Sequence, residues 1–564
     1  MKKYLALFLA ILLAAACFAG CGNTSEPAGS GSGGAATGGS SAQPASGGTA
    51  KVSGPGELPI VTDPVTLRIF TMQNTSVEDY YDNKFTHFLQ DQTGITLEFD
   101  LVPEQDQIQK VNLLLASNTN LPDIFICSGG ITNDIIADMA DQGIFIPLDD
   151  MIEEHGYWYK QALEKDPLID PMMKLPDGKQ YSMPRVVKSL PNSTAGRMWI
   201  NQVWMDNLGL KTPTTIDELA DVLRAFRDND ANGNGDPTDE IPFIGASITG
   251  WNSAPDQFIM NAFVQYNRDN IYYIKDGKIE SGIDKDEYRQ GLIYMNMLCA
   301  EGLLDPATFT QDQTQLTQLF DNEDIALVGM APGGGTFQWA SMDEDRVREY
   351  VPLSPVAGPD GTRRAFYNPY TDYRVNEFVI TSACKNPEAA FKLADFMYSR
   401  EVCMRNRLGE PGVDFRIPDA SEKGIDGDPA SYDPILLWGS VQKSHWNEVG
   451  PAYNDFDNNG VLGDNPYELQ QYLWNAMENY YLPYIPAPES VYNNLTFYTV
   501  EDARKMSDVW STLRDYQRES VAKFATGVID PNSDSDWQQY LAELENIGHW
   551  DRIEIMQARY DQTK

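Results

Sequence analysis

The folded part of the chain begins with a regular alternation of short apolar stretches and longer amphipathic ones. The short stretches, typical of strands, are residues 65–70, 96–102 and 121–127. Apolar residues at helical spacing predict helices over residues 80–92 and 105–117, and Gly94 predicts the end of the first. Strand, helix, strand, helix, strand is the order of a parallel sheet with helices on both faces. We therefore expect an α/β fold whose ligand lies at the carboxyl ends of the strands.

The same two patterns recur farther along the chain. Apolar positions at helical spacing predict helices over residues 286–300, 387–398, 500–525 and 537–560. The segment from Tyr181 to Arg197 is interpreted as the first crossing from one lobe into a second. The apolar stretch at residues 325–330 predicts a strand that returns the chain to the first lobe.

A further helix is predicted directly before an acidic loop. Thr214 or Thr215 begins it, because a threonine hydroxyl can accept the first free N–H groups of a helix. Asp217 and Glu218 follow in the first turn, where the helix dipole favours negative charge. Apolar residues recur at helical spacing as far as Phe226, so one face of this helix is predicted to be buried.

The loop that follows, residues 228–240, is rich in Asp, Asn and Gly and predicts a calcium site. Calcium takes about 6–8 oxygen ligands, and alternating Asp and Asn around a glycine turn supply several of them. In one register Asp228 is the first ligand and Gly233 forms the turn; in the other, which we favour, Asp230 is first and Gly235 forms the turn. The ligands are then Asp230, Asn232, Asn234, Asp236 through its backbone carbonyl, Asp239 and Glu240. The alternative is an Asx-rich turn that needs no metal.

Several blocks around this loop together resemble one protein family. They are residues 178–184, residues 198–213, the repeat at 232–235 with Asp-Glu-Ile-Pro at 239–242, and a looser block at 380–400. On these blocks the chain is similar to the large extracellular solute-binding lipoproteins of carbohydrate ABC importers, from about residue 67 onward. The chain departs from the family pattern in having one residue more between the Asn-Gly repeat and the Asp-Glu pair. The glycine turn at 409–412 also fits the family pattern only roughly.

The resemblance implies a two-lobed, periplasmic-binding-protein-like α/β fold with a central cleft and a hinge. The segments that we expect are a signal peptide at 1–20, a lipidated tether at 21–62, lobe 1 at 63–195, lobe 2 with the calcium loop at 196–325, the return to lobe 1 at 326–425, and lobe 2 with the closing helices at 426–564. The resemblance also implies that the calcium ion is structural and lies away from the sugar.

The first residues have the pattern of a bacterial export signal. Two lysines precede an apolar stretch at residues 4–18, which is short for a membrane span. Small residues then precede Cys21, which resembles the lipidated first residue of a mature lipoprotein; Cys17 is the alternative. Residues 22–51 are mostly Gly, Ser, Ala and Thr, typical of a flexible tether. We therefore expect an extracellular protein, held on the outer face of the cell membrane by lipid alone.

Composition and charge narrow the possible partners. A formal net charge of −40 argues against nucleic acid and anionic lipid. A hydrophobic content of 42% is typical of a globular protein, which we expect to be a monomer. The cysteines beyond the export signal match no zinc motif and are interpreted as structural thiols, with a pair between the last two left open. They are Cys127, Cys299, Cys384 and Cys403.

A sugar offers apolar C–H faces and a ring of hydroxyl groups, so its site needs flat aromatic rings with polar groups at their edges. Tryptophans in loop-like surroundings are candidates for such rings, although each alone is more often a core residue. The end of the third predicted strand and the first crossing supply further candidates. The predicted ligand-binding residues are Ser128, Gly129, Tyr181, Trp251, Trp339 and Trp446.

Motifs for catalysis are weak, so we expect no catalytic residues and no enzymatic activity. None of the histidines stands in a His-Glu-x-x-His motif, and no serine has the Gly-x-Ser-x-Gly pattern. The predicted function is a lipid-anchored protein that captures a carbohydrate, an oligosaccharide, by hinge closure and passes it to ABC-transporter permease subunits. The alternatives are a secreted calcium-dependent polysaccharide-degrading enzyme and a cell-surface adhesion or scaffold protein with dockerin-like calcium loops. Dockerin-like modules carry two such calcium loops. The second candidate loop in this chain, residues 455–460, lacks a closing carboxylate, which argues against an adhesion or scaffold protein.

Overall fold

The computed structural model describes residues 50–127, 129–321, 325–340, 345–436, 439–466 and 468–562. The chain divides into the units Met1–Gly48 and Thr49–Lys564, and the described residues all belong to the second. The predicted signal peptide, Cys21, most of the tether and Ser128 lie outside the described residues. None of the helices in the described part has the length and apolar character needed to cross a membrane.

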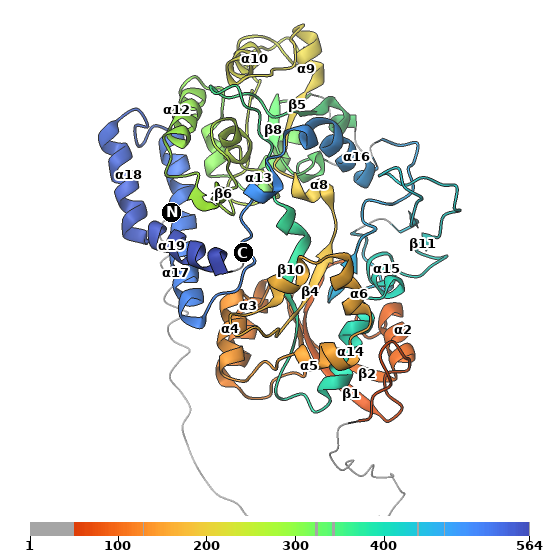
Figure 1. The fold of residues 1–564 in the computed structure, drawn as a ribbon. Helices are drawn as coiled ribbons and strands as arrows, with labels where there is room; N and C mark the ends of the chain where they lie inside the picture. The colour runs from red at the N-terminus through yellow and green to blue at the C-terminus, as the bar shows by residue number, and fades with distance from the viewer. Residues whose placement is uncertain are drawn as a thin grey trace, which may run out of the picture. The chain divides into compact units, whose positions relative to one another are not determined.

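The larger sheet begins with the predicted alternation of strands and helices (Figure 1). β1 (Val65–Gln73) lies parallel to β2 (Ile95–Pro103) on one side and to β3 (Ile124–Ile126) on the other. Between them, α2 (Lys84–Thr93) and α3 (Gln107–Ser117) pack on β2. The parallel arrangement predicted from the alternation is confirmed.

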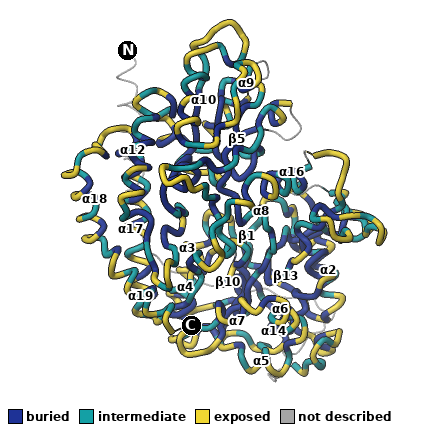
Figure 2. The backbone as a smooth tube through the Cα atoms, turned by 45° about the horizontal axis from the view of Figure 1, so that its top comes forward, coloured by how far each residue is buried: buried dark blue, intermediate teal, exposed yellow. Residues whose placement is uncertain are grey.

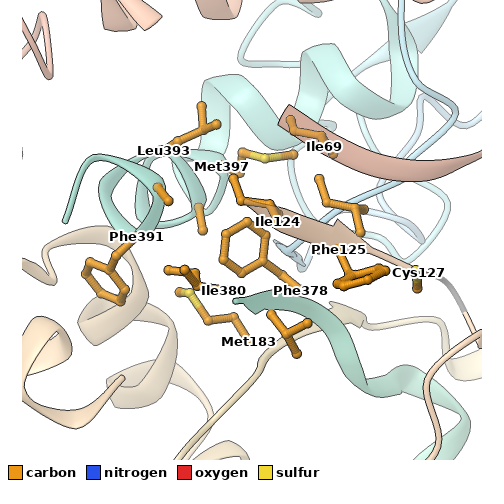
Figure 3. Packing of buried hydrophobic residues seen from close by; sticks show 14 of the residues in the cluster. Ile69, Ile124, Phe125, Cys127, Met183, Phe378, Ile380, Phe391, Leu393 and Met397 are labelled. Carbon is orange, nitrogen blue, oxygen red and sulfur yellow. The ribbon is translucent and has the colours of Figure 1, made fainter. Parts of the chain in front are cut away.

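Later segments complete this sheet, which the described residues build in the order β13-β4-β10-β3-β1-β2. β10 (Tyr373–Ile380) lies antiparallel to β3 and to β4 (Met183–Val187), and β13 (Ala452–Asn454) lies parallel to β4. Helix α14 (Pro387–Met397) packs on β10, and Figure 3 draws its Phe391 and Met397 together with Phe125 and Phe378 of the strands. All of these side chains are buried, so the sheet and α14 enclose the core of lobe 1.

The second lobe is built on a smaller antiparallel sheet. β5 (Met198–Asn201) pairs on one side with β8 (Met330–Pro332) and on the other with β9 (Tyr350–Leu353). The strand expected at residues 325–330 to return the chain to lobe 1 therefore starts at Met330 and stays in lobe 2. The apolar residues before it bridge to the end of the acidic loop, where Val328 pairs with Ile241. An apolar stretch shows that a segment is buried, but not in which lobe.

Helices surround the smaller sheet and connect to lobe 1. α10 (Ile216–Asp228) begins as predicted, with the Thr215 side chain accepting from the Glu218 N–H. α12 (Asp286–Ala300) packs against α17 (Val500–Ala525), and α17 also contacts α4 (Asn133–Asp141) of lobe 1. Figure 2 shows mostly buried residues along β10 and mostly exposed residues in the loop beyond α10.

The single closing helix expected at residues 537–560 is two helices in the structure. They are α18 (Asp534–Ile547) and α19 (His549–Gln562). Gly548 separates them with a φ of 96°, a left-handed conformation that favours glycine. The cysteines of the described residues are unpaired, as interpreted, so Cys384 and Cys403 form no bond.

The segments that cross between the two sheets lie side by side. α8 (Leu190–Ser193) leads from β4 to β5, and the short helix η6 (Pro369–Asp372) leads back toward β10. The N–H of Asn368 donates to the Ser193 carbonyl at 2.8 Å, and the N–H of Ser189 donates to Asp372 Oδ1 at 3.3 Å. The two crossings are therefore bonded to each other where a hinge would bend.

Candidate ligand-binding site

A cavity of about 330 Å³ lies next to the crossing segments, and we call it the main cavity. Residues of the larger sheet, both crossings, α16 (Leu469–Ala476) and loops of the two lobes line it. Its lining residues are Arg185, Val187, Ser189, Asn192, Trp251, Phe337, Thr371, Asp372, Arg374, Arg407, Glu448, Asp457, Leu469, Gln470 and Leu473. Apolar rings and charged groups therefore face the same space.

The aromatic wall of the main cavity is formed by Trp251 and Phe337, both partly exposed. Their ring centroids lie 5.9 Å apart, with the planes tilted by 36°. A Cβ added to Gly335 would lie 2.5 Å from Cε1 of Phe337, too close for any real side chain. A Cβ added to Gly334 would meet the Trp251 ring in the same way. The glycines that precede Trp339 in the sequence therefore make room for two other aromatic rings.

The loop that carries Trp251 is held in an unusual conformation. Gly250 has a φ of 112° and Asn252 a φ of 57°, so Trp251 stands between two left-handed residues. The Trp251 N–H donates to Gln338 Oε1 at 2.9 Å, and the Gly334 N–H donates to the Trp251 carbonyl at 2.8 Å. Strained backbone of this kind persists where surrounding contacts hold it, and it clusters at ligand sites. The indole ring is thus presented by a loop with a fixed conformation.

A buried arginine ties this aromatic segment to the first crossing. The Arg197 guanidinium donates hydrogen bonds to the carbonyls of Gly334 and Pro191. Burial lowers the pKa of Arg197 to about 10. Its carbonyl partners lie on α8 and on the glycine segment, so Arg197 positions the aromatic wall relative to the hinge.

Charged side chains form the lobe 1 side of the main cavity. Glu448 Oε2 accepts from Arg407 Nη1 at 2.9 Å and lies 3.6 Å from Arg185 Nη1. Arg407 also pairs with Asp457, and these two residues and Glu448 are buried. Glu448 has a φ of 66°, a conformation rare for a residue other than glycine. Removing one partner of a buried ion-pair network is costly, because it leaves the other charge buried without a partner. The network therefore fixes the positions of these polar groups in the cavity wall.

Asp372 adds a carboxylate from the hinge itself. Burial raises its pKa to about 6, the nearby carboxylates of Asp457 and Asp166 act in the same direction, and the Ser189 N–H and Lys188 oppose them. Its charge therefore changes within the mildly acidic range.

The predicted ligand residues are placed in different parts of the molecule. Trp251 lines the main cavity, whereas Trp339 and Trp446 are buried in cores. Trp339 stacks on Phe320, with ring centroids 4.1 Å apart. Trp446 donates from Nε1 to Thr86 Oγ1 at 2.8 Å. These two rings cannot offer a flat face to a ligand, because other side chains already cover them.

Tyr181 and Gly129 are also absent from the lining of the main cavity within the described residues. Tyr181 is buried, and its hydroxyl donates to Asp177 Oδ2 at 3.0 Å. Gly129 has a φ of 84°, as expected for a turn glycine after β3.

Sequence reasoning missed Phe337, Arg185, Asp372 and Arg374. Arg185 lies just inside the segment interpreted as the first crossing, Asp372 lies at the end of the second, and Arg374 follows it at the start of β10. Charged residues on a segment that joins two lobes are the signal that could have found them. Phe337 carries no comparable signal, because its ring is directed by contacts with distant residues.

In the acidic loop, hydrogen bonds join Asp230 to the turn at Gly235 and Glu240 to the start of the loop. The Gly235 N–H donates to Asp230 Oδ2 at 2.9 Å, and Gly235 has a φ of 91°. Glu240 Oε1, from the end of the loop, accepts from the Ala231 N–H at 2.9 Å. Asp228, the first ligand in the other register, instead pairs with Arg227 at 2.7 Å. The loop therefore brings Asp230 and Glu240 toward one point.

Two carboxylate oxygens in this loop have no hydrogen-bond donor in the part of the chain that the structure describes. Among the residues described, Asp230 Oδ1 and Glu240 Oε2 are buried without a hydrogen-bond partner. Burial raises the pKa of Glu240, and the charge of Asp239 adds to the effect. Buried carboxylate oxygens without donors are costly unless a cation satisfies them.

The side-chain amides of the loop also contribute oxygen atoms that a calcium ion could bind. Asp239 accepts from the side-chain amides of Asn232 at 2.9 Å and of Asn234 at 2.7 Å. The described residues contain no cluster of three or more His, Cys, Asp or Glu that could hold a metal, so amide and carbonyl oxygens must complete the set. With those oxygens included, the residues present fit a calcium ion, which prefers such mixed oxygen ligands.

The second loop candidate, residues 455–460, is used differently. Asp455 accepts from Lys165 at 2.9 Å and from Arg400 at 2.8 Å. Asp457 pairs with Arg407 in the wall of the main cavity. These carboxylates are neutralised by cationic side chains, so this loop offers little to a metal ion.

Comparison with known proteins places the chain in a protein family. Residues 74–402 match the family described as bacterial extracellular solute-binding protein, and the chain belongs to this family. The resemblance to solute-binding proteins noted from the sequence is confirmed.

Particular relatives are similar along most of the chain. The chain is 29% identical over 513 residues to the fructooligosaccharide ABC transporter substrate-binding protein FusA of Streptococcus pneumoniae serotype 4, covering 88% of this chain and 90% of FusA. The solved structure of S. pneumoniae FusA in complex with kestose matches with a TM-score of 0.72 at 26% identity, covering 88% of this chain and 99% of that one. A FusA EF-hand mutant in complex with fructo-nystose gives a TM-score of 0.72 at 25% identity, with coverage of 88% and 99%. The expected two-lobed α/β fold is confirmed.

Proposed function

We propose that this protein is the substrate-binding component of a carbohydrate ABC importer and holds an oligosaccharide in the main cavity. The observation that carries the proposal is the wall of Trp251 and Phe337 facing polar groups such as Asp372. Aromatic faces cover the apolar C–H surface of a sugar ring, and carboxylates and guanidinium groups bond its hydroxyls. The names of the relatives, which include a fructooligosaccharide-binding protein, support the same class of ligand.

The ligand is captured by hinge closure. Lobe 1 contributes Arg185 to the main cavity, and lobe 2 contributes Trp251 and Phe337. A sugar that touches both lobes has more contacts when they approach, so it shifts the population toward the closed form. The bonded crossings at Ser189 and Asp372 are the segments that bend.

Calcium has a structural role in this proposal. Asp230, Asn232, Asn234, Asp239 and Glu240 hold the ion through side-chain oxygens, and Asp236 contributes its backbone carbonyl. The buried, partnerless oxygens of Asp230 and Glu240 support this, as does the existence of an EF-hand mutant of a similar protein. When bound, the ion neutralises the carboxylates and fixes the turn between α10 and Ile241. The loop contributes no residue to the main cavity among the described residues.

The anchor and partners follow from the proposed role. Cys21, the lipidated residue, holds the protein on the outer face of the cell membrane after signal-peptide removal, and residues 22–51 give it reach. The protein acts as a monomer that delivers its sugar to permease subunits. It has no catalytic role, in keeping with relatives that are named as binding proteins.

A thermal-shift screen with product analysis tests this function. Neutral oligosaccharides and sugar acids are added singly to the calcium-loaded protein, and each mixture is then analysed for cleaved sugar. We expect a rise in melting temperature with at least one oligosaccharide, which is recovered intact. Cleavage would support the polysaccharide-degrading enzyme instead, and no shift with any sugar would contradict carbohydrate binding.

A further inference from the structure

A second cavity shares Trp251 with the main cavity. We call it the side cavity; its volume is about 170 Å³. Residues 247–254, which form the Trp251 loop, line much of it, together with Gln257, Arg268, Asp269 and Arg518. It lies within lobe 2, and Arg518 comes from α17, the long helix that also contacts lobe 1. The role proposed above makes no use of these residues.

The walls of the side cavity are polar but nearly neutral. Arg518 Nη2 pairs with Asp269 Oδ1 at 2.7 Å, and Arg268 Nε lies 3.5 Å from Asp256 Oδ2. Each cationic group thus has an acidic neighbour. A negatively charged ligand would be repelled by these carboxylates and would find both arginines already paired. Hydroxyl groups, in contrast, can donate to the carboxylates and accept from the arginines.

The paired side chains of Arg518 and Asp269 are accessible to a ligand. The side chain of Arg518 is 34% exposed and that of Asp269 is 74% exposed. Ser247 also lines the cavity, and its hydroxyl oxygen is buried with no hydrogen-bond partner among the described residues. The exposed Arg518 and Asp269 side chains are therefore the groups that can bond a ligand.

Trp251 is fixed between the two cavities. The Thr249 hydroxyl accepts from the Gln313 N–H at 3.0 Å, and the Ser253 hydroxyl donates to Gln313 Oε1 at 2.6 Å. These bonds come from α13 (Gln313–Phe320) and hold the loop on both sides of Trp251. A ring held in this way keeps its position whether or not a ligand is bound, so it can serve as a wall for both spaces.

We propose that the side cavity is a second sugar subsite, which takes a neutral unit of the oligosaccharide whose other units fill the main cavity. This inference rests on the proposed function and adds to it a lower limit on ligand size. Trp251 contacts the chain at the point where it passes from one cavity to the other. Arg518 and Asp269 bond the hydroxyls of the unit beyond it.

The test compares sugars of increasing length by titration calorimetry. The calcium-loaded full-length protein without its lipid is titrated with sucrose, kestose and nystose, and separately with maltose, maltotriose and maltotetraose. In the series that binds, we expect affinity to increase with length. Arg518→Ala should lower the affinity for the longest member about tenfold and change that for the disaccharide less than twofold.

Controls separate a subsite from a structural effect. Arg514→Ala removes an arginine from the same helix that pairs with Asp515 and lines neither cavity, so affinities at every length should stay unchanged. An equal loss at all lengths in Arg518→Ala, or affinity independent of length in the unmodified protein, would overturn the subsite while leaving carbohydrate binding intact. The same titrations with galacturonate oligomers test charged sugars, and no binding of any of these sugars would overturn both the subsite and the proposed function. Binding of the galacturonate oligomers alone, weakened by Arg518→Ala, would contradict the neutral subsite.

Discussion

Gly334 lies so close to Trp251 that a Cβ on the glycine would be 2.1 Å from Cε3 of the indole. The glycine backbone therefore forms the surface on which the ring rests. Gly334→Ala should displace Trp251 and weaken oligosaccharide binding by about 1–3 kcal/mol, the scale of a lost aromatic contact in a binding site. Calorimetry with the best-binding sugar measures this.

Gly463→Ala is the matched control for that variant. The nearest heavy atom to its added Cβ is 3.9 Å away, so affinity should not change. If Gly334→Ala and Gly463→Ala both bind like the unmodified protein, Trp251 does not contact the sugar.

Trp446 should matter for stability and not for the ligand. Its ring lies against Phe85, with centroids 5.1 Å apart, and only 1% of the residue is exposed. Trp446→Ala leaves a large cavity in lobe 1 and should lower the free energy of unfolding by about 3–5 kcal/mol. Chemical denaturation measures it, with Trp550→Ala, a residue 39% exposed, as a control that should cost much less. A variant that is as stable as Trp550→Ala but loses sugar affinity would return Trp446 to the ligand site.

The contrast between Trp251 and Trp446 shows what the sequence could predict. Both stand in polar, loop-like surroundings, yet one lines a cavity and the other is a core residue. The direction of a ring in a loop depends on contacts with distant segments, here Gly334 for Trp251 and Thr86 for Trp446. Local patterns do not contain that information.

Elements with a strong local signal were predicted well. α12 and α17 have the predicted bounds, and the N-cap at Thr215 was read from the threonine and the acidic first turn. The main cavity was beyond reach, because Arg185, Phe337 and Asp372 come from three segments far apart in the chain. Only the tertiary fold brings them together.

The pH dependence of stability should reveal the hinge carboxylate. The pKa of Asp372 rises from 3.8 to about 6 through burial, so the folded state binds more protons than the unfolded state between these values. Its contribution to the free energy of unfolding therefore decreases as pH rises from about 4 to about 6 and is constant above. Asp372→Asn lacks this titration, so the variant should become more stable than the unmodified protein as pH rises through that window.

Denaturation at several pH values, in excess calcium, measures this difference. Excess calcium keeps the titration of Glu240 out of the comparison. A difference between the two proteins that does not vary from pH 4 to 7 would contradict the raised pKa.

Calcium removal should destabilise the protein without abolishing sugar binding. Binding to the folded state alone adds about 2.7 kcal/mol at a calcium concentration one hundred times the dissociation constant. Chelation should lower the melting temperature, and calcium should restore it better than magnesium. Asp230→Ala should abolish the response, because it removes a buried oxygen that has no other partner.

Asp236→Ala is the control within the same loop. The Asp236 side chain accepts from Thr238 at 2.6 Å, and only its backbone carbonyl is proposed as a ligand, so the calcium response should persist. A melting temperature indifferent to chelator, with no metal in elemental analysis, would contradict the calcium proposal. Loss of sugar binding by folded Asp230→Ala would place the ion in the ligand site.

Titration calorimetry on Trp251→Ala and the unmodified protein tests the central claim most directly. We expect saturable binding of an oligosaccharide that is recovered intact, with affinity at least about tenfold weaker in the variant, which corresponds to about 1.4 kcal/mol. Equal affinity of the two proteins for the sugar would contradict a main cavity that binds carbohydrate against Trp251, and recovery of cleaved sugar would contradict a binding protein.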